Sequence, residues 1–171
     1  YKKITIFLID QMSSKKNSSA ALYRQGLKLL RGEGVQKNIK AAGTNIKMAA
    51  ENGYVQAIYH YAEMLYEGEG FDQNKLEAAK YYKIAADKGN AIAMLKYAKM
   101  SYNGNGIDVN KEEAAYYFKQ AADKGDAESM NYYAQMLTKG EGVEQNITEA
   151  ASYFKMASEK GNISATDSYA L

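Results

Sequence analysis

The sequence predicts an all-α protein that folds as an α-solenoid, a row of antiparallel helix hairpins with a period of 36 residues. The composition favours helices, because the chain is rich in alanine, the best helix former, and has no proline, the strongest helix breaker. Glycine, asparagine and alanine also recur at a fixed interval, and a period between about 20 and 50 residues is typical of solenoid arrays. The 171 residues suffice for one domain with a buried core.

The repeat is defined by glycines, asparagines and alanines that stand in strict register. Every step within a series is 36 residues, so composition alone does not explain the pattern. The series are Gly32, Gly68, Gly104 and Gly140; Gly34, Gly70, Gly106 and Gly142; Gly53, Gly89, Gly125 and Gly161; Asn38, Asn74, Asn110 and Asn146; and Ala42, Ala78, Ala114 and Ala150. They define four repeats, residues 18–53, 54–89, 90–125 and 126–161.

Each repeat is expected to hold two helices, A and B. In the third repeat, helix A carries Tyr97 and Ala98 on one apolar face at helical spacing. Helix B begins at Asn110, a favoured N-cap residue, with Glu113 three residues later as a capping-box partner. It ends at Gly125, for which we predict the positive φ of a left-handed cap. Helices of about 12 residues are marginal alone, so their stability must come from packing between hairpins.

The two ends depart from the repeat pattern. Residues 1–17 form a degenerate N-terminal segment that the register aligns with helix B of a preceding repeat, and a strand over residues 4–9 is the alternative. Residues 162–171 restart helix A of a fifth repeat and stop before its helix B. Because a solenoid end normally carries a polar cap, we expect further repeats or a partner chain at the C-terminal end.

Composition and charge argue against several functional classes. Lys and Arg total 22 and Asp and Glu total 20, and this near balance argues against a general nucleic-acid or anionic-membrane surface. The longest apolar run, residues 4–9, is far shorter than the roughly 20 residues of a membrane span. The absence of Cys excludes a disulfide scaffold and favours a reducing compartment, so we expect a cytoplasmic protein.

The sequence also lacks a recognisable catalytic or cofactor site. His60 is the single histidine, and we expect it to be a surface side chain rather than a metal ligand or a general base. The Gly-x-Gly elements lack the third glycine and the preceding strand of a phosphate-binding loop, so we interpret them as turns between helices. We therefore predict a non-enzymatic protein with no catalytic residue, no cofactor, no metal and no small-molecule substrate.

The repeat unit resembles a known family. The block Glu113–Ala127, followed by Tyr133, Ala134 and the turn Gly140–Val143, is similar to the Sel-one-like (Sel1-like) repeat, an α-solenoid class related to tetratricopeptide repeats. The resemblance covers about residues 18–171, and it implies a right-handed superhelix whose A helices line the concave side of a protein-binding adaptor. Asn replaces the family's usual acidic residue before helix B, and Tyr-Ala replaces a common Leu-Gly in helix A. The disulfide-bridged secreted branch is not matched, because the chain has no Cys.

The functional signal lies in one stripe of helix A that varies between repeats while the core positions stay fixed. Such positions are available to specify a partner, and the alternative is that they are unconstrained solvent surface. The candidate partner-binding residues are Arg24, Gln56, His60, Glu63, Lys96, Lys99, Glu128, Tyr132 and Gln135. We expect Lys96, Lys99 and Tyr132 to converge on one patch, outside the repeated core, that suits an extended acidic segment.

Two functions are compatible with these features. The leading one is a non-enzymatic scaffold or adaptor that binds a protein or an extended peptide along the groove of the A helices. The alternative is a structural docking component of a larger multi-protein assembly, which would use the solenoid ends and the convex face of the B helices.

Overall fold

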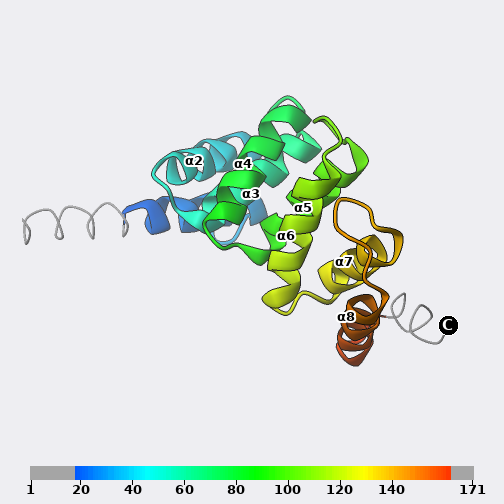
Figure 1. Cartoon of the computed structure of the whole chain (residues 1–171). Helices are drawn as coiled ribbons and strands as arrows, with labels where there is room; N and C mark the ends of the chain where they lie inside the picture. Colours follow the sequence, from blue (N-terminus) through cyan, green and yellow to red (C-terminus); the bar gives the residue numbers. More distant parts are fainter. Residues whose placement is uncertain (1–17, 163–171) are drawn as a thin grey trace, which may run out of the picture. The chain divides into compact units, whose positions relative to one another are not determined.

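The regular secondary structure that the structure describes is entirely helical. A computed structural model describes residues 18–162, and this range contains no strand. Predictions for residues 1–17 and for a fifth-repeat helix over residues 163–171 lie outside it. Residues 18–31 are helical and are followed by α2 (Ile39–Glu51), α3 (Val55–Glu67), α4 (Lys75–Asp87), α5 (Ala91–Asn103), α6 (Lys111–Asp123), α7 (Ala127–Lys139) and α8 (Ile147–Glu159) (Figure 1). In the predicted scheme, α3, α5 and α7 are A helices, and α2, α4, α6 and α8 are B helices.

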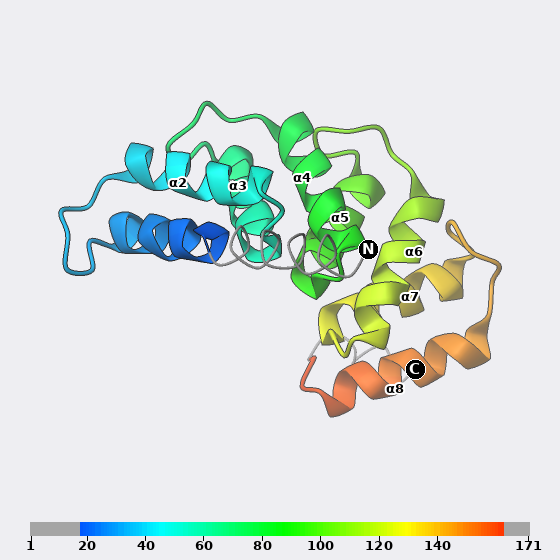
Figure 2. The same ribbon diagram turned by 90° about the vertical axis from the view of Figure 1, so that its left-hand side faces the viewer.

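Two compact units divide the chain between Ala85 and Ala86. In the N-terminal unit, α2 packs against α3, and Figures 1 and 2 show α2 beside the helix of residues 18–31. In the C-terminal unit, α5 packs on α6, α6 on α7, and α7 on α8. These helices therefore pack on their neighbours in the chain, which is the contact pattern of stacked hairpins.

Asparagine and glycine mark the helix boundaries as the sequence predicts. The side-chain oxygen of Asn110 accepts a hydrogen bond from the Glu113 N–H at 3.0 Å, and the asparagines that precede the other B helices make the same cap. The predicted positive φ after helix B is confirmed, because φ is +91° at Gly89 and +95° at Gly125.

The second glycine of the Gly-x-Gly turn is required by a close approach of two backbones. At Gly142 φ is +70°, and a Cβ atom would lie 2.3 Å from the carbonyl oxygen of Lys111, the first residue of α6. Gly70 makes the matching contact in the N-terminal unit, where a Cβ would lie 3.0 Å from the carbonyl oxygen of Ile39, the first residue of α2. The turn after helix A therefore packs on the start of the preceding helix B.

Alanines and aromatic rings fill the core. Ala62, Ala98 and Ala134 are fully buried, which lets the helix backbones approach closely, and Phe118 is also fully buried. Three tyrosine pairs repeat within the hairpins with edge-to-face geometry and ring centroids 4.7 to 5.0 Å apart, as favoured by the aromatic quadrupole. The pairs are Tyr61 with Tyr81, Tyr97 with Tyr117, and Tyr133 with Tyr153.

Candidate functional site

The variable stripe divides between the two units. Its N-terminal part consists of Arg24, in the helix of residues 18–31, and of Gln56, His60 and Glu63 on α3. Its C-terminal part consists of two residues on α5 and three on α7, namely Lys96, Lys99, Glu128, Tyr132 and Gln135. Arg24 and Gln56 are exposed, whereas the other seven residues are half-buried. Most side chains of the stripe are therefore partly accessible and partly packed against their neighbours.

His60 is packed against aromatic rings rather than lying free at the surface, so the expectation of a surface side chain is wrong. Its Nδ1 atom lies 2.5 Å from the Tyr23 hydroxyl, and the two rings stack with centroids 5.4 Å apart. Tyr59 covers another side at 5.3 Å. Burial lowers the pKa of His60, and Arg31 adds to this effect while Glu63 opposes it. The fold therefore favours neutral imidazole here.

Glu63 is held in place by tyrosine hydroxyls of the same unit. The Tyr82 hydroxyl donates a hydrogen bond to Glu63 Oε1, and Tyr59 also hydrogen-bonds this carboxylate. Burial, together with the nearby carboxylate, raises the pKa of both phenols, so both remain protonated donors at neutral pH. In the next repeat, Lys99 stands at the position of Glu63, and Phe118 stands at the position of Tyr82. The aromatic ring therefore has no hydroxyl in the repeat where a cation replaces the carboxylate.

In the C-terminal unit, Lys99, Glu128 and Tyr132 meet. Lys99 Nζ lies 2.8 Å from Glu128 Oε1 and 5.4 Å from the centre of the Tyr132 ring, a cation–π contact. The hydrogen bond to Glu128 is the main cause that raises the pKa of Lys99, against the effect of burial. Lys96 lies three residues before Lys99 on α5, and Gln135 lies one turn after Tyr132 on α7.

Tyr132 is part of the packing and not only of the surface. Its ring stacks on fully buried Phe118 with centroids 4.8 Å apart and planes 7° apart. Tyr132 is half-buried, and its ring covers a core side chain of α6. A substitution at Tyr132 tests stability as well as binding.

Sequence reasoning missed a second cluster beside Tyr132. Tyr102 lies 6.5 Å from Tyr132 between ring centroids, and its hydroxyl donates to Glu141 Oε2 at 2.6 Å. Lys111 Nζ lies 3.0 Å from Glu141 Oε1 and 5.4 Å from the centre of the Tyr102 ring. The hydrogen bond to Glu141 is the main cause that raises the pKa of Tyr102 to about 12.

A spacing in the sequence could have revealed this cluster. Tyr102 and Lys111 are nine residues apart, and Tyr66 and Lys75 occupy the matching positions one repeat earlier. Lys75 Nζ also lies 5.4 Å from the centre of the Tyr66 ring. The cation–π contact between the end of helix A and the start of helix B is therefore a repeated feature.

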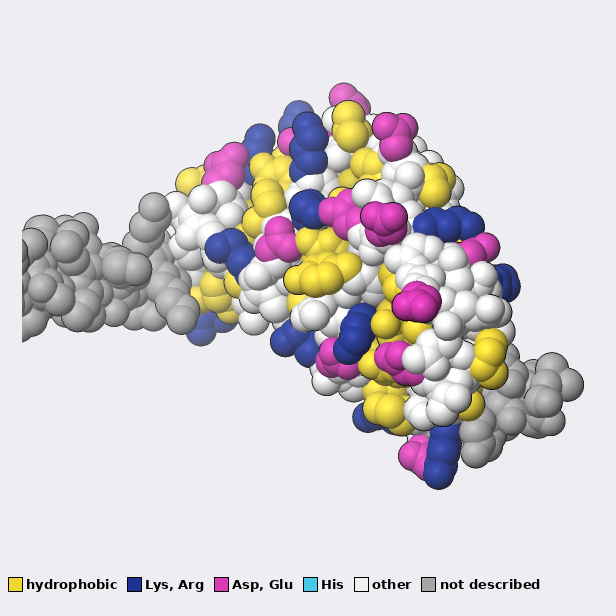
Figure 3. All heavy atoms as spheres, in the orientation of Figure 1, with side chains coloured by type: hydrophobic (Ala, Val, Ile, Leu, Met, Phe, Trp, Pro, Cys, Tyr) yellow, Lys and Arg dark blue, Asp and Glu magenta, His cyan; other side chains and the backbone are white. Residues whose placement is uncertain are grey.

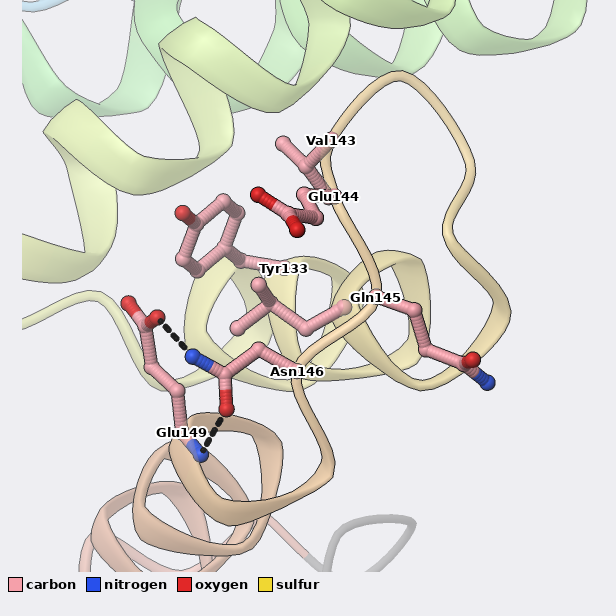
Figure 4. Close-up of a pocket in the computed structure, with 7 residues that line it drawn as sticks. Tyr133, Val143, Glu144, Gln145, Asn146 and Glu149 are labelled. Carbon is pink, nitrogen blue, oxygen red and sulfur yellow. Dashed lines mark hydrogen bonds between the residues drawn. The ribbon is translucent and has the colours of Figure 1, made fainter.

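One concavity of the C-terminal unit is lined by polar groups that already serve the fold. It has a volume of about 350 Å³ and lies between α7 and the turn that precedes α8 (Figure 4). Its Asn146 side chain accepts from the Glu149 N–H at 3.0 Å and donates to Glu149 Oε2 at 3.1 Å, as the dashed lines in Figure 4 show. These bonds cap α8, so the asparagine has a structural role here.

The described surface mixes charges of both signs. Figure 3 shows Lys and Arg side chains interspersed with Asp and Glu side chains on one face of the molecule. Within residues 18–162, no three His, Asp or Glu side chains are grouped so that they could hold a metal ion. No helix in this range is both long enough and apolar enough to cross a membrane.

The fold and its repeat define the class of this protein, an α-solenoid of helix hairpins with a period of 36 residues. The Sel1 repeat pattern matches residues 19–54, 55–90, 91–126 and 127–162, each range beginning one residue later than the repeats drawn from the sequence. The chain belongs to the Sel1 repeat family. Members of this family are typically scaffolds for protein–protein interactions and are generally non-catalytic. No curated protein sequence matches the chain.

Solved structures of repeat proteins are similar to this chain. The protective antigen c5321 of uropathogenic Escherichia coli, which displays an SLR fold, is 29% identical with a TM-score of 0.82, over 91% of this chain and 34% of that one. A Sel1 repeat protein from Oxalobacter formigenes is 27% identical with a TM-score of 0.78, over 90% of this chain and 62% of that one. Cysteine-rich protein B of Helicobacter pylori, at 22% identity and a TM-score of 0.57 over 76% of this chain and 96% of that one, shares the fold.

The match spans only part of the longer relatives. The chain corresponds to about a third of the E. coli antigen and to less than two thirds of the O. formigenes protein.

Proposed function

We propose that this chain is a non-enzymatic scaffold that binds a protein or an extended peptide along the surface of its A helices. One observation carries the proposal: five of the positions that vary between repeats belong to preorganised polar and aromatic clusters. The N-terminal cluster consists of His60, Glu63 and their tyrosine partners, and the C-terminal cluster of Lys99, Glu128 and Tyr132. Side chains already held in one geometry lose less conformational freedom on binding, which favours affinity.

The two clusters offer a partner different chemistry. The N-terminal cluster presents a carboxylate anchored by phenols beside a neutral imidazole, whereas the C-terminal cluster presents an ammonium over an aromatic face. A surface that changes in character from one repeat to the next can select a partner by sequence rather than by charge alone.

The test compares partner capture by two charge-reversal variants. Lys96→Glu with Lys99→Glu alters the A-helix surface, and Lys88→Glu with Lys155→Glu makes the same change in charge at exposed sites of the same unit. Each variant is used to capture proteins from native extract, with quantitative mass spectrometry and a circular-dichroism check of helicity. We expect the first variant to lose a specific partner that the wild type and the second variant retain.

A docking role at the B helices is the second candidate, and one observation favours it. Three B helices expose a large apolar side chain at the same repeat position, Met48, Ile84 and Met156, with 45%, 42% and 42% of the residue accessible. If capture survives the Lys96 and Lys99 change but is lost when Met48 and Ile84 are changed to Gln, the B-helix face is the binding surface. The proposal for the A helices is then wrong.

We further propose that the chain works in a reducing compartment such as the cytoplasm. The support is the absence of Cys from all 171 residues, since repeat proteins in oxidising compartments gain stability from disulfides. Cell fractionation followed by immunoblotting tests this, and recovery in an extracytoplasmic fraction would contradict it.

A further inference from the structure

Four side chains of the C-terminal unit form a series of neighbouring contacts that we call the lysine–tyrosine track: Lys99, Tyr132, Tyr102 and Lys111. Lys99 Nζ lies 5.4 Å from the Tyr132 ring centre, the two tyrosine rings are 6.5 Å apart, and Lys111 Nζ lies 5.4 Å from the Tyr102 ring centre. The residues come from α5, α6 and α7, so the track exists only in the folded protein. It has a cation at each end and aromatic faces between them.

Each end of the track is closed by a carboxylate of the chain itself. Glu128 Oε1 lies 2.8 Å from Lys99 Nζ, and Glu141 Oε1 lies 3.0 Å from Lys111 Nζ. Between 28% and 46% of each of these four side chains is accessible, so both pairs lie at the solvent edge. Exposed ion pairs are individually weak, and a carboxylate from another molecule can replace the internal one with little loss.

Resting on the proposed function, we propose that the lysine–tyrosine track binds an acidic segment of a partner protein, whose carboxylates replace Glu128 on Lys99 and Glu141 on Lys111. The internal carboxylates mark where the partner's carboxylates bind. The partner backbone and its apolar groups then contact the parts of the half-buried Tyr132 and Tyr102 rings that remain accessible.

The geometry favours an acidic rather than a basic occupant. Both lysines rest on tyrosine faces as well as on carboxylates, so they stay oriented when the carboxylates leave. A basic occupant would have to draw Glu128 and Glu141 away from ammonium groups that remain beside them. An extended chain advances about 3.4 Å per residue, so carboxylates at most about five residues apart can reach both lysines along the track.

The test measures binding of fluorescein-labelled decaglutamate to the full chain by fluorescence anisotropy at low salt. Decalysine and oligodeoxythymidylate serve as comparison probes. Lys99→Gln with Lys111→Gln removes the two cations, and the matched control, Lys88→Gln with Lys155→Gln, removes two exposed lysines of the same unit. Glu128→Gln removes the internal competitor, and Glu112→Gln is its control at an exposed site on α6.

The expected results have opposite signs for the two kinds of change. The double lysine variant should weaken decaglutamate binding by about tenfold or more, while its control changes it by less than about twofold. Glu128→Gln should tighten decaglutamate binding by about two- to fivefold, and by more than Glu112→Gln does. The reason is that the Glu128 carboxylate no longer competes with the peptide for Lys99. Thermal melts should show that all variants remain folded.

Several results would overturn this inference. It fails if wild type does not bind decaglutamate, if decalysine or the oligonucleotide binds as tightly, or if each control matches its variant. Tighter binding of the oligonucleotide would assign the track to phosphates instead. If decaglutamate does not bind while partner capture still depends on Lys96 and Lys99, the acidic segment is excluded and the scaffold function stands.

Discussion

Replacing Gly142 with alanine should destabilise the C-terminal unit far more than the same change at Gly125. Both glycines have positive φ, +70° and +95°, so alanine is strained at either site by about 1 to 2 kcal/mol. Alanine also restricts the unfolded chain, which offsets about 0.4 to 1 kcal/mol of that strain. Backbone conformation alone therefore predicts a loss of about 1 kcal/mol at both positions.

The surroundings of the two glycines differ. At Gly125, the added Cβ meets only the end of the Lys160 side chain, at 3.5 Å, which is an ordinary contact. At Gly142, it would lie 2.3 Å from the carbonyl oxygen and 2.4 Å from the carbonyl carbon of Lys111. These are backbone atoms, so no rotamer change relieves the clash, and overpacking of this kind adds about 1 to 3 kcal/mol. We expect Gly142→Ala to lower the free energy of unfolding by about 2 to 4 kcal/mol.

Urea titrations of wild type and both variants, followed by circular dichroism at 222 nm, measure the difference directly. Repeat arrays can unfold in more than one step, so the urea midpoints of two proteins are compared only where their transitions have the same m-value. Equal losses in the two variants would refute the contact between the turn after α7 and the start of α6. A rise in stability for Gly125→Ala would refute the left-handed cap after α6.

Three further outcomes are expected. Burial lowers the pKa of His60 in the folded protein, so between that pKa and about 6.5 the unfolded chain binds more protons than the folded chain. The free energy of unfolding should therefore fall as the pH drops through this window. NMR titration of the imidazole in the folded protein should give a pKa below 6.5. Tyr82→Phe with Glu63→Ala should lose about 1 kcal/mol less than the sum of the two single changes, because each single change already removes the hydrogen bond between these side chains. Additive urea-denaturation values would contradict the bond. Tyr132→Phe should keep the melting temperature of the wild type, whereas Tyr132→Ala should lower it by several degrees, because the ring and not the hydroxyl covers Phe118. Equal melting temperatures of the two variants would exclude that packing.

The features that repeat could be predicted from the sequence because each is fixed by local chemistry. An N-cap such as Asn110 requires only its own helix turn, and a positive φ at Gly125 requires only that helix B end there. The alanine series predicts close helix packing for the same reason. These are short-range constraints, and the 36-residue period copies them four times.

The contacts of the variable stripe could not be predicted in the same way. A lone histidine without metal-ligand partners at suitable spacing is expected at the surface, but this argument does not report that the rings of Tyr23 and Tyr59 contact His60. Likewise, Tyr132 lies on the variable stripe and also stacks on Phe118, a residue of another helix. Long side chains bridge neighbouring helices, so one position can belong to the surface and the core together.

The substitutions along the stripe show that its clusters are matched sets. Where Glu63 stands, the ring beneath is Tyr82, whose hydroxyl donates to the carboxylate. Where Lys99 stands, the ring at the same repeat position is Phe118, which offers no acceptor or donor but supports the stacked Tyr132. A change of charge on the surface is thus accompanied by a change in the core beneath it. A partner that binds either unit must compete with pairs such as Lys99 and Glu128 that the fold has already formed, so its affinity depends on how weakly those internal pairs are held at the solvent edge.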